Sequence, residues 1–242
     1  MSGAVLVVGA GDATGGAIAR AFAAEGLTAC VNRRARNVDQ LEALAQSIRD
    51  DGQNAKAFPG DAREEADMVR IVDEIERDIG PLEVAVFNIG ANVRFPITDM
   101  TAQVYRKVWE MACFSGFLMG REVAKRMIPR GRGTILFTGA TASLRGGSGF
   151  SAFSGAKAGL RMLAQSMARE LGPQNIHVAH IVIDGGIDTD FIRSIRPDFD
   201  AMKAADGVLS PDAIAANYVF LHKQHRSAWT HELDLRPWSE SF

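Results

Sequence analysis

Short apolar segments alternate along this chain with longer segments whose apolar residues recur at helical spacing. Residues 38–49, for example, place Leu41, Leu44, Ala45 and Ile48 on one helical face. We expect strands at 4–8, 28–31, 55–58, 84–87, 133–138, 177–183 and 232–235, and helices at 17–24, 38–49, 66–78, 105–128, 151–171 and 211–222. Continuous apolar strands separated by helices predict a parallel sheet covered on both faces. The predicted fold class is therefore α/β, a Rossmann-like doubly wound parallel sheet flanked by helices on both faces.

The size and composition of the chain suit one compact domain spanning residues 1–242. The chain has 242 residues, of which 47% are hydrophobic, enough for a sizeable core. Its 27 basic and 29 acidic residues give a net charge of −2, so no basic excess points to nucleic acid or a membrane surface. No apolar run approaches the ~18 residues of a membrane span, and residues 1–8 lack the cationic start of a signal peptide. Cys30 and Cys113 lie in separate apolar segments without metal-ligand spacing, which predicts a reduced, cytoplasmic protein.

A glycine-rich turn follows the first predicted strand and precedes an alanine-rich helix. This turn contains Gly9, Gly11, Ala13 and Gly15. Glycines allow the backbone to approach a phosphate, and the N–H groups at a helix start attract it. The position of the turn between a strand and a helix predicts a dinucleotide site, and a single domain built around it predicts a nucleotide-binding protein.

The end of the second predicted strand bears on which dinucleotide is bound. Proteins that bind NAD usually carry an acidic residue there to hold the ribose hydroxyls. This chain has Asn32, Arg33 and Arg34 instead. A guanidinium group pairs well with a 2′-phosphate, so the sequence favours NADP(H) over NAD(H). The alternative is that both arginines belong to an ordinary solvated loop.

Several further motifs appear in the order and spacing of one family. Asp61 follows the third strand, Asn88 and Gly90 follow the fourth, and the sixth strand leads into a segment with Gly185, Ile187 and Thr189. With the glycine turn, they make the chain resemble the short-chain dehydrogenase/reductase family over nearly its whole length. The resemblance implies that Asp61 contacts the adenine and that Asn88 and Gly90 line the cofactor site. It also implies that Gly185, Ile187 and Thr189 hold the nicotinamide end, although Asp184 replaces the proline of the family motif.

The resemblance also identifies four catalytic positions, and three of them are changed. The family pairs a proton-transferring tyrosine with a lysine four residues later, and here these positions are Phe153 and Lys157. The family serine position falls at Ala140 and the family asparagine position at Cys113. Only Lys157 therefore matches the family tetrad. The ending at 229–238 also resembles an atypical bacterial branch with a similarly altered active site.

Other groups that could supply a proton or bind a metal are interpreted as structural. Tyr105 and Tyr218 lie on predicted helices that we expect to be remote from Phe153. Thr141 and Ser143 are expected to satisfy backbone groups, although either could turn toward a substrate. The remaining candidates are Cys113, His177, His180, Asp184, Asp188 and Asp190. Cys113 and the two histidines are expected to be structural, and no metal site is predicted because no ligand spacing supports one.

Two functions remain open from the sequence. The first is an NADP(H)-dependent oxidoreductase with weak or non-standard hydride transfer, because the cofactor residues are kept. The second is a non-catalytic nucleotide-binding sensor or partner subunit, because Ala140, Phe153 and Cys113 are changed together. By resemblance, the helical segments 105–128 and 151–171 pair subunits, which implies a homodimer or homotetramer. Residues 184–210 show weak periodicity and are expected to form a loop over the site. The small-molecule substrate or ligand is not identified by these patterns.

Overall fold

A computed structural model describes residues 3–240 and contains one seven-stranded sheet in which every pairing is parallel. The strand order is β3-β2-β1-β4-β5-β6-β7. The strands are β1 Ala4–Val8, β2 Thr28–Asn32, β3 Ala55–Ala57, β4 Leu82–Phe87, β5 Gly133–Thr138, β6 Ile176–Ile183 and β7 Glu232–Leu235. The predicted fold class is confirmed, while the predicted domain of 1–242 includes four terminal residues outside the described range.

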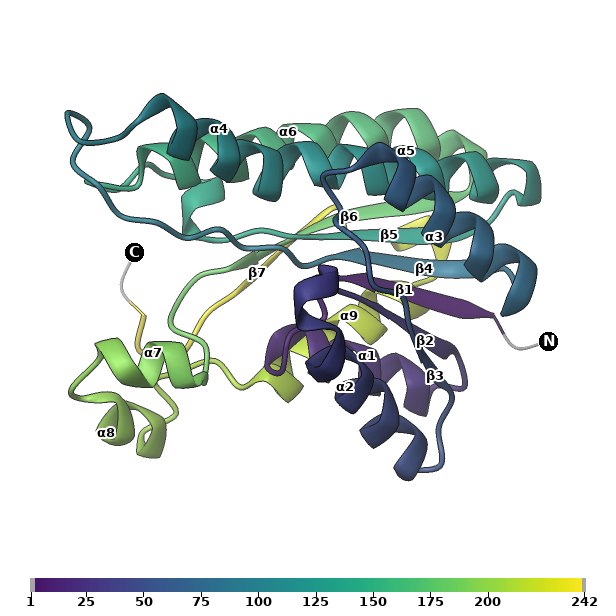
Figure 1. Ribbon diagram of the computed structural model, residues 1–242, viewed down its shortest axis with the longest axis horizontal. Helices are drawn as coiled ribbons and strands as arrows, with labels where there is room; N and C mark the ends of the chain where they lie inside the picture. The colour runs from purple at the N-terminus through teal and green to yellow at the C-terminus, as the bar shows by residue number, and fades with distance from the viewer. Residues whose placement is uncertain (1–2, 241–242) are drawn as a thin grey trace.

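Helices cover both faces of the sheet, so each strand side needs apolar residues (Figure 1). One face carries α3 Glu65–Asp78, α4 Ala102–Trp109, α5 Ser115–Met127 and α6 Ser151–Leu171. The other carries α1 Thr14–Ala24, α2 Val38–Asp50 and α9 Pro211–Lys223. Two large buried clusters fill the space between the helices and the sheet, one on each face. All eight residues of β6 are buried, as expected of a strand covered on both sides.

The strand order places the site. The chain adds strands outward from β1 in one direction and then in the other, because β2 lies on one side of β1 and β4 lies on the other. The switch point is therefore between β1 and β4. In doubly wound sheets, ligands bind beyond the carboxyl ends of the strands at this switch point. The turns after β1, β4 and β5 meet there.

Two segments differ from the pattern expected from the sequence. The predicted helix 105–128 begins earlier, at Ala102, and is interrupted by a π-helical segment, Glu110–Phe114. The predicted loop 184–210 contains two helices, α7 Asp190–Ile195 and α8 Phe199–Ala204, which lie apart from both helical layers in Figure 1. Six-residue helices are too short to give a clear apolar period, which explains why the sequence pattern missed them.

No helix within residues 3–240 combines the length and the apolar character needed to cross a bilayer.

Candidate active site

The carboxyl edge of the sheet contains a cavity of about 710 Å³. Its walls come from the turn after β1, the segments after β4 and β5, the first half of α6, and the segment after β6. A second cavity of about 230 Å³ adjoins it at the ends of β2 and β3. Gly9, Gly11, Asn88, Ile89 and Gly90 line both cavities, so together they form one elongated cleft.

The glycine-rich turn is close to other backbone. Gly9 has a φ of +87°, and a Cβ there would lie 2.9 Å from the carbonyl of Asn88. A Cβ on Gly15 would lie 2.4 Å from the oxygen of Gly9. Ala13, where the family has glycine, is the N-cap of α1 with a φ of −95°, so it does not take the left-handed conformation that favours glycine. The turn therefore keeps the close packing and the helix start that bind a pyrophosphate.

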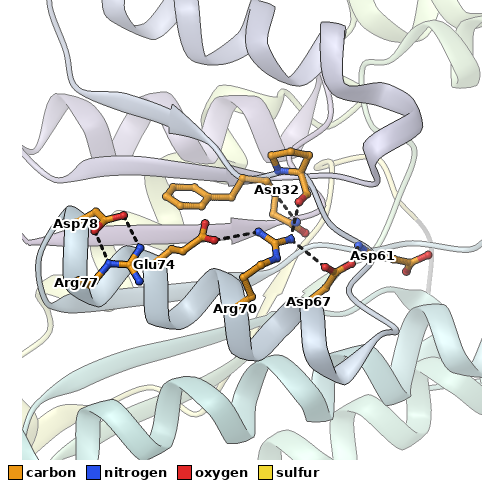
Figure 2. Close-up of polar contacts among 9 residues, drawn as sticks. Asn32, Asp61, Asp67, Arg70, Glu74, Arg77 and Asp78 are labelled. Atoms are coloured by element: carbon orange, nitrogen blue, oxygen red, sulfur yellow. Dashed lines mark hydrogen bonds and ion pairs between the residues drawn. The ribbon is translucent and has the colours of Figure 1, made fainter.

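The loop after β3 is fixed from two sides. Buried Asn32 donates from Nδ2 to the carbonyl oxygens of Phe58, at 2.8 Å, and Gly60, at 3.2 Å. From α3, Asp67 accepts the backbone N–H of Asp61 at 2.8 Å, as Figure 2 shows. The Asn32 side chain is thus used to hold this loop.

The second cavity is rich in guanidinium groups. Arg33, Arg34, Arg63 and Asp61 all line it. Arg63 binds Asp61 with both Nε, at 3.0 Å, and Nη2, at 2.5 Å, and this hydrogen bonding lowers the pKa of the Asp61 carboxyl. Burial, and then the neighbouring Arg36 charge, lower the pKa of Arg34. Asp61 is the one carboxylate among these four side chains, and it is already paired with Arg63. The cavity therefore keeps an excess of positive charge.

Arg33 adds an unmet hydrogen-bonding group to this cavity. Its buried Nη1 has no hydrogen-bond partner and lies 3.5 Å from Asp12 Oδ1, an ion-pair distance. A buried donor without a partner carries a free-energy cost that a bound anion would remove. The residues of this cavity therefore fit a phosphate-bearing nucleotide. Arg63 was missed by the sequence analysis, although its place two residues after Asp61 was a usable signal.

Lys157 on α6 lies at the floor of the larger cavity. Its side chain is 2% exposed, and Nζ donates to the backbone oxygens of Ile89, at 2.9 Å, and Thr138, at 2.7 Å. Burial lowers the Lys157 pKa to about 7, because the charged form loses hydration. Phe153 lies one helical turn earlier on α6 and lines the same cavity. The two residues therefore occupy one wall, as their spacing predicts.

The other two changed positions lie near this wall. Ala140 lines the cavity, and its N–H donates to Ser143 Oγ at 3.1 Å. The Ser143 hydroxyl is therefore hydrogen-bonded to the backbone, as expected. Cys113 lies in the π-helical segment, with Sγ 3.0 Å from where a Cβ on Gly159 would be. Burial raises the Cys113 pKa, which keeps the thiol protonated at neutral pH.

The expectation that both tyrosines lie far from the motif is wrong. Tyr105 Oη lies 2.8 Å from where a Cβ on Gly155 would be, so this ring packs on α6 at the segment Phe153–Lys157. The sequence could not show this, because α4 and α6 meet only in the fold. Tyr218 is fully buried, and its hydroxyl lies 2.7 Å from Thr138 Oγ1. Neither tyrosine lines the cavity.

Asp184 forms a polar network that the sequence analysis did not anticipate. Its carboxylate is 1% exposed and accepts a hydrogen bond from the Thr141 hydroxyl. Its Oδ2 lies 3.5 Å from Arg145 Nη2 and 4.0 Å from Arg236 Nη2. Thr141 therefore turns toward Asp184, which stands where the family has proline.

The segment after Asp184 reaches the cavity as predicted by resemblance. Gly185, Ile187 and Thr189 all line it. The Thr189 hydroxyl accepts the N–H of Ile192 at 3.1 Å and thereby caps α7. This hydroxyl therefore has a structural use in addition to the predicted cofactor contact.

The predicted structural histidines both lie on β6 and do not line the cavity. His180 is fully buried, with Nδ1 3.1 Å from Glu232 Oε2, and burial lowers its pKa to about 4. His177 stacks on Trp229 with ring centroids 4.8 Å apart. Within the described part of the chain, no three His, Cys, Asp or Glu side chains are grouped so that they could hold a metal ion.

Comparison with known proteins agrees with this geometry. The family described as short chain dehydrogenase matches residues 3–200. A short-chain dehydrogenase structure from Rhodopseudomonas palustris is 47% identical, with a TM-score of 0.84, covering 98% of this chain and 99% of that one. The short-chain dehydrogenase/reductase eriH of Hericium erinaceus is 33% identical, covering 90% of each chain. A 2-dehydro-3-deoxy-D-gluconate 5-dehydrogenase of Formosa agariphila is 28% identical, covering 89% of this chain and 84% of its own. The chain belongs to the short-chain dehydrogenase/reductase family of oxidoreductases.

Proposed function

We propose that this protein is an NADP(H)-dependent oxidoreductase in which Lys157, and not a tyrosine, supplies or accepts the substrate proton. The observation that carries the proposal is the position of Lys157. It is buried, it lines the cavity beside Phe153, and its pKa is lowered to about 7. A group whose pKa lies near the working pH is suited to general acid–base chemistry.

Support for the cofactor comes from the two ends of the cleft. The packed turn at Gly9 and Gly15 fits a pyrophosphate, and the guanidinium groups of Arg33 and Arg34 fit a 2′-phosphate. When bound, the nicotinamide supplies or accepts the hydride. The relatives reported above are named as dehydrogenases or reductases, which supports redox chemistry over the non-catalytic alternative.

The hydrogen bonds of Lys157 explain how it would act. The ammonium has three protons, and two are donated to the carbonyl oxygens of Ile89 and Thr138. The third can be directed into the cavity, either to a substrate oxygen or to a water. Because the protonated form donates, the rate of reduction should fall as pH rises through about 7. The rate of the reverse oxidation should rise over the same range.

The test combines binding with turnover. NADPH and NADH are titrated calorimetrically, and NADPH oxidation is then measured on a panel of a ketone, an imine and an enone, for the wild type and Lys157→Met. We expect NADPH binding, slow wild-type turnover, and a loss of about 10²-fold or more in the variant. NADPH binding without turnover on any substrate would favour the non-catalytic alternative. Absence of NADPH binding would overturn the proposal.

We also propose that the protein forms homodimers or homotetramers through α4, α5 and α6. Trp109, Phe117 and Met162 on these helices are exposed large hydrophobic residues. Trp109 stacks on Phe114 with ring centroids 5.7 Å apart, so this face presents a continuous aromatic surface. Contiguous exposed apolar surface marks an interaction site. Sedimentation velocity at micromolar concentration should show a dimer or larger species, and a monomer would contradict this.

A further inference from the structure

The substrate end of the cavity has apolar walls and one guanidinium group. The apolar side chains at this end are Phe150, Phe153, Ile187, Phe191 and Ile192. Arg145 follows the turn Thr141–Ser143, lines the same cavity and has a side chain that is 48% exposed. Of the other charged residues lining the cavity, Asp12 pairs with Arg33, and Lys157 places two of its three protons on carbonyl oxygens and keeps the third for the reacting oxygen in the proposed function. Arg145 is therefore the charge left to bind an anionic group of a substrate.

Asp184 holds Arg145 at this end of the cavity by a single long contact. The Asp184 carboxylate accepts from the Thr141 hydroxyl and lies within ion-pair distance of both Arg145 and Arg236. Arg236 also pairs with Asp234, so its charge is compensated there. Thr141 and Arg145 come from the segment after β5, Asp184 from the end of β6 and Arg236 from the end of β7, and these three segments converge at this end of the cavity.

The geometry of the Arg145 pair differs from that of a structural ion pair in the same protein. Arg161 binds Glu232 with two hydrogen bonds, of 2.6 and 2.7 Å. Arg145 has one contact of 3.5 Å to Asp184, and in the described chain its side chain makes no other hydrogen bond. A guanidinium has five N–H donors in a planar fork that matches a carboxylate. Most of the Arg145 donors are therefore free to bind an anion that enters the cavity.

We propose that this cavity binds a substrate that carries a carboxylate on a hydrophobic skeleton. Arg145 receives the carboxylate, and the walls formed by Phe150, Phe153 and Phe191 enclose the skeleton. A carbonyl on the same skeleton then lies toward Lys157, so the substrate is an oxo acid. This inference rests on the proposed function, because it names the substrate class of the same cavity.

The experiment compares two probes that differ in charge but not in shape. They are 4-acetylbenzoate and 4-acetylbenzamide, titrated calorimetrically into protein saturated with NADPH. We expect the wild type to bind the carboxylate about 10–100-fold more tightly than the amide, as for a hydrogen-bonded charge. Arg145→Gln should remove this preference and leave amide binding within about 3-fold, because the neutral probe gains nothing from the charge. Arg145→Lys should keep part of the preference.

Arg94→Gln is the matched control. The Arg94 guanidinium lies over the Phe150 ring, 5.7 Å from its centroid, but Arg94 does not line the cavity. This variant should keep the wild-type preference. Equal binding of the two probes to the wild type would overturn the proposal, as would failure of 4-acetylbenzoate to bind at millimolar concentration. The NADPH titration reports separately on the proposed function, and if NADPH does not bind, the same probe ratio is measured on the free protein.

Discussion

The nucleotide end and the substrate end of the cleft are built in different ways. At the nucleotide end, backbone forms much of the surface, with Gly15 packed against Gly9 and the loop after β3 held by Asn32. At the substrate end, side chains form the surface, and the changed positions Ala140 and Phe153 line it. The first end keeps the family's glycines except at Ala13, whereas the second differs at both Ala140 and Phe153.

The two ends therefore use different kinds of groups. Backbone recognition of a phosphate depends on glycines and on fixed loops, which are present at the nucleotide end. The family's proton transfer depends on single side chains, and Phe153 and Ala140 stand at two of those positions here. Lys157 lines the substrate end and donates to the backbone oxygens of Ile89 and Thr138 at its floor.

The largest expected effect comes from restoring the family side chains at the substrate end. Ala140→Ser together with Phe153→Tyr should raise the rate of NADPH-dependent carbonyl reduction by about 10²–10⁴-fold, the usual contribution of a positioned general acid. Both positions line the cavity, so the new hydroxyls face the substrate. The measurement is kcat/KM on an activated ketone.

A matched double variant separates this effect from added polarity. Ala142→Ser with Phe95→Tyr introduces the same two hydroxyls, one at another position of the cavity and one at an exposed residue outside it. Its rate should stay within about 3-fold of the wild type, because those hydroxyls lack the family geometry. An equal gain in both double variants would mean that the substrate end needs only polar groups.

The nucleotide end should lose affinity for NADPH when a side chain is added at a closely packed glycine. Gly15→Val should lower the NADPH affinity by about 100-fold or more, because a Cβ there lies 2.4 Å from the Gly9 oxygen and the turn must move. Gly172→Val is the control, since no atom lies within 4 Å of its Cβ position and it lines neither cavity. It should bind NADPH within a few-fold of the wild type by calorimetry. Similar losses in both variants would contradict the packing described for this turn.

The two ends also differ in how far the sequence could predict them. The continuous apolar strands and the glycine turn are local patterns, so they predicted the sheet and the nucleotide end. The contacts of Asp184 with Thr141 and Arg145 join segments about 40 residues apart in the sequence, and no local period encodes such a pair. The contact of Tyr105 with Gly155 was missed for the same reason. Side-chain networks between loops therefore required the structure.

A smaller effect is expected from changing the cofactor charge pocket. Arg34→Gln should weaken NADPH binding by about 10–100-fold and leave NADH binding nearly unchanged, because only NADPH carries a 2′-phosphate. Arg34 lines the second cavity, whereas Arg36, two residues later, does not. Arg36→Gln is therefore the control and should change the NADPH affinity by less than about 3-fold. Equal weakening of NADH binding and NADPH binding by Arg34→Gln would show that the arginine does not bind the 2′-phosphate.

A separate prediction, on stability and not on activity, concerns the pH dependence of unfolding, and it tests the protonation state of Lys157. The folded-state pKa is about 7, below the model value of 10.5 for an unfolded chain. Between these values the unfolded state binds more protons, so the stability of the free protein should rise with pH from about 7 to 10 through this group. The slope can reach about 1.4 kcal/mol per pH unit. It is measured by urea unfolding at several pH values.

Other buried groups change the stability in the opposite direction as pH rises. The contribution of Lys157 is therefore obtained as the difference between the wild-type and variant stability curves. Burial raises the Cys113 pKa, and stability therefore falls through that thiol as the unfolded form ionises first. Subtracting the Lys157→Met curve from the wild-type curve cancels this contribution and isolates the lysine. Lys107→Met, at an exposed position on α4, should leave the wild-type slope intact. If Lys157→Met keeps the wild-type slope as well, then the folded-state pKa of Lys157 is not lowered to about 7, and the pH dependence proposed for the reaction loses its basis.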